Sequence, residues 1–586
     1  MLTSGVLTSG PAFSTAHHPA DGSPGLGRDS AATRTGNTFG PPNDQCEWEI
    51  RMSVAQDSAV AAGATTGSGD WVDGLFTNPV VAGFHPDPSV CRVGEDYFLA
   101  CSSFEYFPGV PIFHSRDLVH WEQLGNALDR PSQLSLPPET PSSGGIYAPT
   151  LRHHDGRFWL IVTNVAPGGG NLVVTATDPA GPWSEPVRLA GIAGIDPDLA
   201  WDGEGRCWCT YAGVHQVRVD PDTGETFGSP KRLWSGAPGA QAPEAPHLYR
   251  IGGYWYLLIA EGGTERGHAV SVARAAAPDG PFEPCPANPI LTHRGTNRPI
   301  QNTGHADLVQ AADGSWWMVL LGVRPRGGTP GWHVLGRETF LAPIAWVDGW
   351  PVVGEVGPAM AAPPWPPQPV AEPPLRDDFD AERLHPRWIS VRSRPAECWS
   401  TTDRPGWLTL HARGGSLDDP DVTFLGRRQQ HLSCRVRALV DAGDGRGGLA
   451  VRLDERHHYE IEAGDGQVLV TARTGSLRST VATRTPPAGP VRLRIDVVAS
   501  PAESWHPREE PDLLRLGVEA SDGTFDVLAE LDGRYLSTEV AGGFTGRVIG
   551  MYAVAGTVRF DWFDYEPVEA GATPGSESAG ETIVAP

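Results

Sequence analysis

Long apolar runs are missing from this chain of 586 residues, of which 40% are hydrophobic and 20% charged. No stretch approaches the roughly 20 consecutive apolar residues that a membrane-spanning helix needs. The N-terminal residues, MLTSGVLTSG, contain neither the basic segment nor the continuous apolar segment of a secretory signal. We therefore expect a cytoplasmic protein that has no membrane partner.

Basic residues are also scarce. The chain has 45 Lys and Arg against 70 Asp and Glu, which gives a formal net charge of -25. An acidic surface without a basic run repels nucleic acid and anionic membranes. A neutral small-molecule ligand fits this charge better than a polyanion, although the acidity could serve solubility alone.

Cysteine motifs are absent as well. None of the eight cysteines forms a CxxC pair or a zinc-like spacing. Cys207 and Cys209 flank Trp208 in an apparent strand and so point to the same face. We expect buried free thiols and no metal held by cysteine.

Glycine and proline are abundant, with 71 Gly and 56 Pro, and this indicates an all-β chain with many turns. Their distribution, with other small residues, predicts three segments without a core. These are a disordered N-terminal extension over 1–75, a stiff Pro-rich linker over 354–373 and a disordered tail over 567–586.

Between the extension and the linker, one unit is repeated five times. In each unit a short motif leads through a turn into an aromatic strand, as in DPSV-CR-VGED-YFLACSS. The apolar anchors of the motif are Val90, Leu151, Leu199, Leu248 and Leu308. Their spacing of roughly 50–60 residues suits one four-stranded blade per unit. We therefore predict a five-bladed β-propeller over 76–353.

The repeat also predicts where a site would form, because the innermost strand of every blade lines the central axis. Three residues before the anchors stand Asp87, Ala148, Asp196, Ala245 and His305. One position earlier stand Pro86, Tyr147, Ile195, Glu244 and Gly304. Each carboxylate alone would pass for a turn or surface residue. Three of them crowded at one axis would repel one another, and this favours a chemical role.

The segment 374–566 has a different pattern. Stretches such as HLSCRVRALV and VRLRIDVVA alternate apolar and polar residues and are separated by turn signals. This alternation predicts an antiparallel β-sandwich, of the concanavalin or jelly-roll kind.

The axial motifs resemble those of glycoside hydrolase family 43, in its β-xylosidase and α-L-arabinofuranosidase branch. Three segments carry the likeness: NPVVAGFHPDPS from Asn78, GIDPDL from Gly194 and EAPHLY from Glu244. SSFEYFPGV, SGGIYAP, AEGGT, LGRET and the later RRQQH are also similar to that branch. The resemblance covers about 76–566. It departs at Tyr147, where the family usually has Trp, and at Ala245, where Gly is common.

The resemblance implies an inverting hydrolase. Asp87 would be the general base, Glu244 the general acid, and Asp196 an ionised neighbour that raises the pKa of Glu244 and orients it. Arg337 would bind sugar hydroxyls, with a structural ion pair as the alternative. Phe104 and Tyr147 would form apolar walls for a pentose, with core packing as the alternative. His305 would support the site as a polar group without a tightly bound metal.

The expected substrate is a small xylo- or arabino-oligosaccharide cleaved from its end. We prefer release of xylose from β-1,4-xylo-oligosaccharides, with an α-L-arabinofuranosidase or a bifunctional enzyme as the alternative. A non-catalytic carbohydrate-binding propeller is a further alternative that the three carboxylates disfavour. The chemistry needs no organic cofactor. Some family members carry an axial calcium ion, and the sequence leaves that ion, and a homo-oligomer, open.

Overall fold

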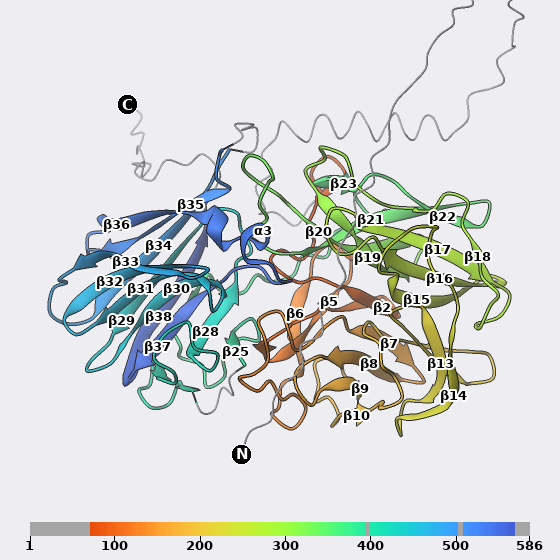
Figure 1. Ribbon diagram of the computed structural model, residues 1–586, viewed down its shortest axis with the longest axis horizontal. Helices are drawn as coiled ribbons and strands as arrows, with labels where there is room; N and C mark the ends of the chain where they lie inside the picture. The colour runs from red at the N-terminus through yellow and green to blue at the C-terminus, as the bar shows by residue number, and fades with distance from the viewer. Residues whose placement is uncertain (1–70, 393–397, 502–507, 569–586) are drawn as a thin grey trace, which may run out of the picture. The chain divides into compact units, whose positions relative to one another are not determined.

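The computed structural model describes residues 71–392, 398–501 and 508–568. These residues form five four-stranded sheets, followed by two larger sheets that face each other (Figure 1). The predicted all-β class, the five-bladed propeller and the β-sandwich are confirmed. Cys46 and nearly all of the N-terminal extension lie outside the described residues, and the other seven cysteines are buried free thiols, as expected.

Each blade is an antiparallel meander of four consecutive strands, except that the short β4 interrupts the first. Blade 1 contains β2 (Ser89–Val93), β3 (Asp96–Ala100), β5 (Gly109–Ser115) and β6 (Glu122–Leu128). Blade 2 contains β7 (Thr150–His154), β8 (Arg157–Asn164), β9 (Gly170–Ala176) and β10 (Val187–Arg188). Blade 3 contains β11 (Asp198–Trp201), β12 (Cys207–Tyr211), β13 (His215–Asp220) and β14 (Glu225–Arg232). Blade 4 contains β15 (Glu244–Ile251), β16 (Tyr254–Glu261), β17 (Ala269–Ala275) and β18 (Glu283–Pro284). Blade 5 contains β19 (Gln301–Gln310), β20 (Trp316–Val323), β21 (Glu338–Val347) and β22 (Trp350–Val353).

The first strand of each blade is the innermost one. Strands β2, β7, β11, β15 and β19 contact one another in a closed ring. The second strands are nearly continuous apolar runs, such as FWLIVTN in β8, because both of their faces are covered by neighbouring blades. The repeat therefore places one equivalent segment of every blade at the axis.

Asn78 helps to close the ring. Its side chain donates to the carbonyl oxygens of Leu341 (3.0 Å) and Gly357 (3.2 Å) and accepts from the Leu341 amide (3.0 Å). Next to it, β1 (Leu75–Thr77) pairs with β23 (Ala359–Ala361). Two sequence predictions differ from the structure in this region. Residues 71–75 are ordered rather than part of the extension, and the predicted linker contains a strand, because its prolines leave an AMA stretch free to pair.

The sandwich has two sheets of eight strands. One sheet runs β26-β27-β38-β29-β34-β35-β36, with β24 also paired to β38, and the other runs β33-β32-β31-β30-β37-β28-β25-β4. The first sheet's strands are β24 (Arg376–Asp377), β26 (Trp399–Ser400), β27 (Leu408–His411), β29 (Cys434–Asp441), β34 (Val491–Ala499), β35 (Asp512–Glu519), β36 (Phe525–Asp532) and β38 (Thr557–Pro567). The second sheet's strands are β4 (Tyr106–Phe107), β25 (Ile389–Val391), β28 (Thr423–Arg428), β30 (Arg446–Asp454), β31 (His457–Gly464), β32 (Gln467–Thr474), β33 (Leu477–Arg484) and β37 (Val548–Ala555). Strand β38 runs to Pro567 and Val568 donates to Ser433, so the predicted tail begins slightly later than expected.

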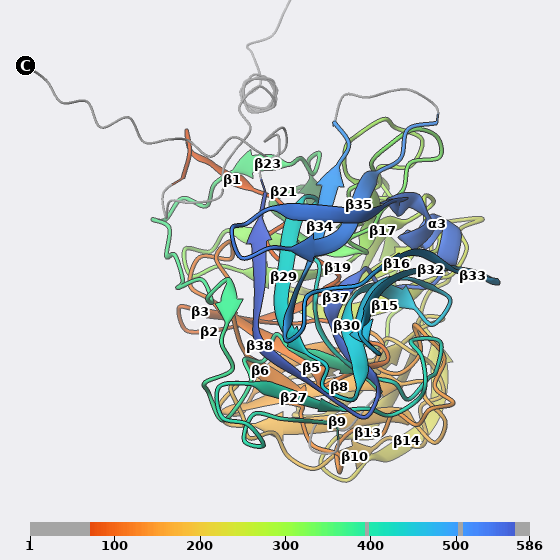
Figure 2. The same ribbon diagram turned by 90° about the vertical axis from the view of Figure 1, so that its left-hand side faces the viewer.

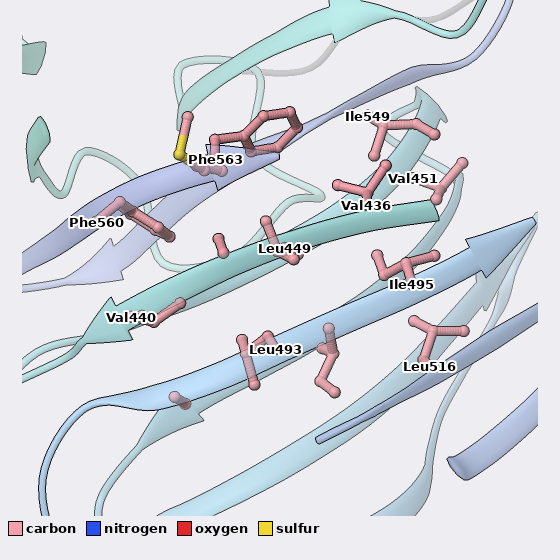
Figure 3. Packing of buried hydrophobic residues seen from close by; sticks show 14 of the residues in the cluster. Val436, Val440, Leu449, Val451, Leu493, Ile495, Leu516, Ile549, Phe560 and Phe563 are labelled. Atoms are coloured by element: carbon pink, nitrogen blue, oxygen red, sulfur yellow. The ribbon is translucent and has the colours of Figure 1, made fainter. Parts of the chain in front are cut away.

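The core of the sandwich lies between its two sheets. Residues of β29 alternate strictly between buried and half-buried, as the sequence pattern predicts. Leu449 from one sheet and Leu493, Ile495 and Leu516 from the other point into the same apolar layer (Figure 3). Figure 2 shows β38, β29 and β34 side by side in the first sheet.

The sandwich is joined to the propeller through a shared strand pair. In β4 of blade 1, Tyr106 and Phe107 pair with Val391 and Ser390 of β25. Between β36 and β37, the 3-10 helix η1 (Gly533–Leu536) and the helix α3 (Thr538–Ala541) precede a loop that carries Phe544. No helix among the described residues is long and apolar enough to span a membrane.

Candidate active site

The axial segments share an unusual backbone conformation. Asp87, Asp196, Ala245 and His305 occupy the same position in four of the five repeats, and all have positive φ, between 44° and 56°. This left-handed conformation costs a non-glycine residue about 1–3 kcal/mol and is concentrated at functional sites. The pairing of β15 is irregular between Glu244 and His247, as expected for a bulge that redirects side chains.

Asp87 is buried and surrounded by donors. Its Oδ2 accepts from the Ser102 hydroxyl at 2.5 Å, and its Oδ1 accepts from Arg337 Nη1 at 3.0 Å. His305 Nδ1 lies 3.5 Å from the same Oδ1. Burial opposes the ionisation of Asp87, but Arg337, His305 and Ser102 outweigh it, so its pKa lies below the usual value. Asp87 is therefore a carboxylate at neutral pH.

Glu244 is held in the opposite state. Burial, followed by repulsion from Asp87, raises the pKa of Glu244 from 4.5 to about 7, against a smaller opposing effect of Arg337. A large part of the Glu244 population therefore carries a proton at neutral pH. The two carboxyl groups differ because Asp87 is directly ion-paired with Arg337 and accepts a hydrogen bond from Ser102, whereas no such direct side-chain partner of Glu244 is found among the described residues.

Asp196 differs from our expectation. We expected an ionised Asp196, but burial, together with repulsion from Glu244 and Asp87, raises its pKa well above the usual range. Its Oδ2 accepts from the backbone amide of Ala245 at 3.2 Å. Asp196 and Glu244 repel each other when both are charged, so the pair retains a proton. This hydrogen bond fixes the backbone at Ala245, the residue next to Glu244.

Arg337 connects the carboxylate to the aromatic residues. Besides Asp87, its Nη1 donates to the Thr264 hydroxyl at 2.9 Å, and its guanidinium lies 5.2 Å from the ring centre of Phe544. The ion pair with Asp87, our alternative for Arg337, is thus present. Arg337 Nε is buried with no acceptor in the described structure, which leaves one N–H unused.

The aromatic wall includes a residue that sequence reasoning missed. Phe544, from the sandwich, lies 5.9 Å from the ring of Tyr147 and 6.1 Å from that of Phe104. Its amide donates to the Ser143 hydroxyl at 2.8 Å. Tyr147 and Phe544 are partly exposed, whereas Phe104 is only 1% exposed within an apolar cluster. Phe104 therefore packs mainly as core, our alternative for it, and Tyr147 and Phe544 present the accessible faces.

Two histidines complete the site. Burial lowers the pKa of His305 to about 3 and that of His268 to about 4, so both rings are neutral. His268 Nδ1 lies 2.9 Å from the Asn302 carbonyl oxygen and serves as its donor, while its Nε2 is buried without a partner. His268, Thr264 and Ser102 were not predicted individually. The only signal for the last two was their place in the AEGGT and SSFEYFPGV motifs.

A second layer of charges lies further along the axis. Arg152 pairs with Asp198 (2.9 Å) and with Asp307 (2.8 Å), and Asp307 also accepts from the hydroxyls of Ser89 and Tyr249. Asp198 and Asp307 stand two residues after Asp196 and His305, so the same motifs supply both layers. These ion-paired carboxylates support the ring of inner strands.

The described residues contain no group of three or more His, Cys, Asp or Glu side chains that could hold a metal ion. The expectations about calcium and organic cofactors remain predictions.

Comparisons with known proteins agree with the geometry. The model of glycosyl hydrolases family 43 matches residues 76–351. The chain belongs to glycoside hydrolase family 43. The model of the β-xylosidase C-terminal concanavalin A-like domain matches residues 376–566, which identifies the sandwich.

Relatives in this family include arabinofuranosidases and xylosidases. A non-reducing end α-L-arabinofuranosidase of Bacteroides ovatus is 40% identical over 84% of this chain and 94% of its own length. A xylosidase/arabinosidase of Butyrivibrio fibrisolvens is 38% identical over 84% of this chain and 98% of its own length. The crystal structure of a xylan β-1,4-xylosidase from Bacillus halodurans is 32% identical, covers 84% of this chain and 100% of its own, and superposes with a TM-score of 0.76.

Proposed function

We propose that this family 43 glycosidase is an exo-acting, inverting enzyme that releases terminal xylose from β-1,4-xylo-oligosaccharides. One observation carries the proposal: Asp87 has a lowered pKa while the pKa of Glu244 is raised to about 7. Glycoside hydrolysis by a pair of carboxyl groups requires one that is ionised and one that carries a proton. Inversion itself rests on the resemblance to the family and is tested below by NMR.

In this mechanism Glu244 protonates the leaving glycosidic oxygen as the bond to the anomeric carbon breaks. Asp87 takes a proton from a water molecule, which attacks that carbon from the opposite face. One water is consumed, the configuration inverts, and the two residues exchange protonation states before solvent restores them. Inverting enzymes keep the two groups about 6.5–9.5 Å apart to admit this water.

The other residues position the reactants. Asp196 orients Glu244 through the Ala245 amide, and the two groups keep each other from ionising together. Arg337 holds Asp87 ionised, and its binding of a sugar hydroxyl remains a prediction. Tyr147 and Phe544 would contact the apolar faces of the pentose.

End-wise cleavage is favoured by the cap that the sandwich places at the axis. Phe544 and its hydrogen bond to Ser143 hold a segment of the accessory domain against Tyr147. A pocket closed on that side accepts a chain end more readily than the middle of a polymer. Cleavage of long, substituted xylan at internal bonds would contradict this part of the proposal.

An α-L-arabinofuranosidase, or a bifunctional enzyme, is the second candidate. The similarity to the Bacteroides ovatus arabinofuranosidase favours it. The two pentoses present similar hydroxyl geometry, so one pocket can accept both.

The test compares turnover of p-nitrophenyl β-D-xyloside and p-nitrophenyl α-L-arabinofuranoside by wild type and Glu244→Ala. Glu225→Ala, on the exposed outer strand of blade 3, is the matched control. Xyloside turnover that Glu244→Ala loses and Glu225→Ala keeps supports the xylosidase with Glu244 as the acid. Arabinoside turnover alone keeps the mechanism and changes the substrate. NMR of freshly released xylose should show the α-anomer first, and the β-anomer would refute inversion.

If folded wild type turns over neither glycoside, calorimetric binding of xylobiose separates the remaining possibilities. Binding without turnover would favour the non-catalytic carbohydrate-binding propeller.

A further inference from the structure

A cavity of about 450 Å³ lies between blade 1, the segment 370–374 and the sandwich. Its lining includes none of the three axial carboxyl residues. The propeller contributes His85, Phe113 and Trp121, and the sandwich contributes arginines. A volume of a few hundred Å³ with aromatic and proline walls is typical of small-molecule sites.

Three arginines line this cavity, namely Arg387, Arg427 and Arg428. Arg427 and Arg428 are only 6% and 4% exposed, and Arg387 is half-buried. No ion pair involving any of them is found among the described residues, although most other buried arginines of the chain are paired. The RRQQH motif of the sequence therefore supplies two adjacent buried cations that the catalytic proposal does not use.

The hydrogen bonds of the three guanidinium groups are incomplete. Arg427 donates from Nη2 to Gln430 Oε1 (3.0 Å), and Arg387 donates from Nη2 to the Pro374 carbonyl (2.8 Å). Arg428 lies over the ring of Phe84, with 4.6 Å from its central carbon to the ring centre. Each of the three has two buried nitrogen atoms without an acceptor in the described structure. Buried cations without an ion-pair partner are costly, and a negative charge in the cavity would offset part of that cost.

The acidic groups near the cavity form no ion pair with these arginines among the described residues, although Asp377 acts on Arg387 and Arg427 electrostatically. Glu122 and Glu372 line it but are exposed, and Glu122 lies 3.2 Å from His114 Nδ1. Asp377 accepts from the Phe379 amide (3.0 Å) and from Trp388 Nε1 (2.8 Å) instead. In a chain with a net charge of -25, this is a local concentration of positive charge that is only partly compensated.

The electrostatics of the cavity lining also favour a negatively charged ligand. Burial, followed by repulsion from Arg427, lowers the pKa of Arg387 to about 10. Burial lowers the pKa of Arg428 to about 10 as well. His85 is kept neutral, because burial and then Arg428 lower its pKa well below the usual value. Positive charge is thus disfavoured throughout the cavity until a negative charge enters it.

We propose that this cavity binds a small organic anion whose phosphate or carboxylate groups are held by Arg387, Arg427 and Arg428. The planar guanidinium fork matches both kinds of oxyanion in a bidentate manner. The apolar walls from Phe113, Trp121 and the prolines would cover the rest of the molecule. Bound there, the anion connects the propeller to the sandwich, so its binding stabilises the whole chain.

The test measures thermal unfolding of the full-length protein with citrate, with inorganic phosphate and with NaCl at matched ionic strength. The site predicts a rise in Tm of about 2–4 °C for the bound anion over the NaCl control at saturation. A response to citrate alone assigns a carboxylate ligand, and a response to phosphate assigns a phosphorylated one. No response to either anion beyond NaCl overturns the proposal.

Variants separate the site from general salt effects. Arg427→Met and Arg428→Met should abolish the Tm rise, without lowering the Tm in NaCl, because each removes an unpaired buried charge. Arg515→Met, which removes an arginine paired with Glu530 elsewhere in the sandwich, should keep the rise. If the buried-site variants do not fold, half-buried Arg387→Met carries the same test. An unchanged Tm rise in the cavity variants refutes the assignment. Because no substrate is present, this result is independent of the proposed glycosidase activity.

Discussion

The raised pKa of Glu244 makes the pH profile the sharpest test of the mechanism. Burial and the Asp87 charge raise this pKa from 4.5 to about 7. At 1.36 kcal/mol per pKa unit, the environment disfavours the Glu244 carboxylate by about 3 kcal/mol. About half of the molecules then hold the acid proton at pH 7, whereas an ordinary glutamate would hold it in well under about 1% of them. The site thereby gains on the order of 100-fold in active acid at neutral pH.

The assay is kcat/KM for xylobiose between pH 4 and pH 9. Because the protonated form of Glu244 is the active one, activity should fall with an alkaline limb near pH 7, about tenfold for each further pH unit. Glu244→Gln should abolish this limb and lower kcat/KM by about 10²–10⁴-fold. Its loss on 2,4-dinitrophenyl β-D-xyloside should be much smaller, since that leaving group departs without a proton.

Two results would refute this reasoning. One is an alkaline limb that persists in Glu244→Gln, and the other is an equal loss on xylobiose and on the dinitrophenyl glycoside. Glu225→Gln, on the exposed outer strand of blade 3, should reproduce the wild-type profile on both substrates.

Three further predictions concern the supporting structure. Phe544→Ala should raise KM for xylobiose about 3–10-fold, because it removes a partly exposed aromatic face of the site; an unchanged KM would place substrate elsewhere. Asp307→Asn should lower the free energy of unfolding by about 3–5 kcal/mol in urea titrations, because it leaves Arg152 with half of its buried charge partners. Burial opposes the ionisation of Asp307, but Arg152 outweighs it and lowers the pKa of Asp307 below 3.8. The difference in the free energy of unfolding between wild type and Asp307→Asn should therefore be largest above pH 3.8 and shrink as the pH falls below it. Leu449→Ala, in the core of the sandwich, should cost about 2–5 kcal/mol by the same measurement and leave kcat unchanged.

The sequence by itself determined the architecture and the place of the site. The spacing of Val90, Leu151, Leu199, Leu248 and Leu308 predicts five blades, because each interval holds one four-stranded meander. Equivalent residues of equivalent blades meet at one axis, so Asp87, Asp196 and Glu244 were identified by repeat position. The alternation in the C-terminal half similarly predicted a sandwich, since each strand buries one face.

Tertiary structure alone decided the pKa values of the site's carboxyl groups and the contacts of its aromatic residues. The pKa of Asp196 is raised because the residue is buried beside Glu244 and Asp87, which no local pattern encodes. Phe544 contacts Tyr147 although nearly 400 residues separate the two in sequence. Phe104 packs as core because residues that are distant in sequence bury it. The arginines of RRQQH form a cavity only where the sandwich meets blade 1. A pKa, an aromatic wall and a charged cavity depend on neighbours that are distant in sequence, and only the folded chain brings those neighbours together.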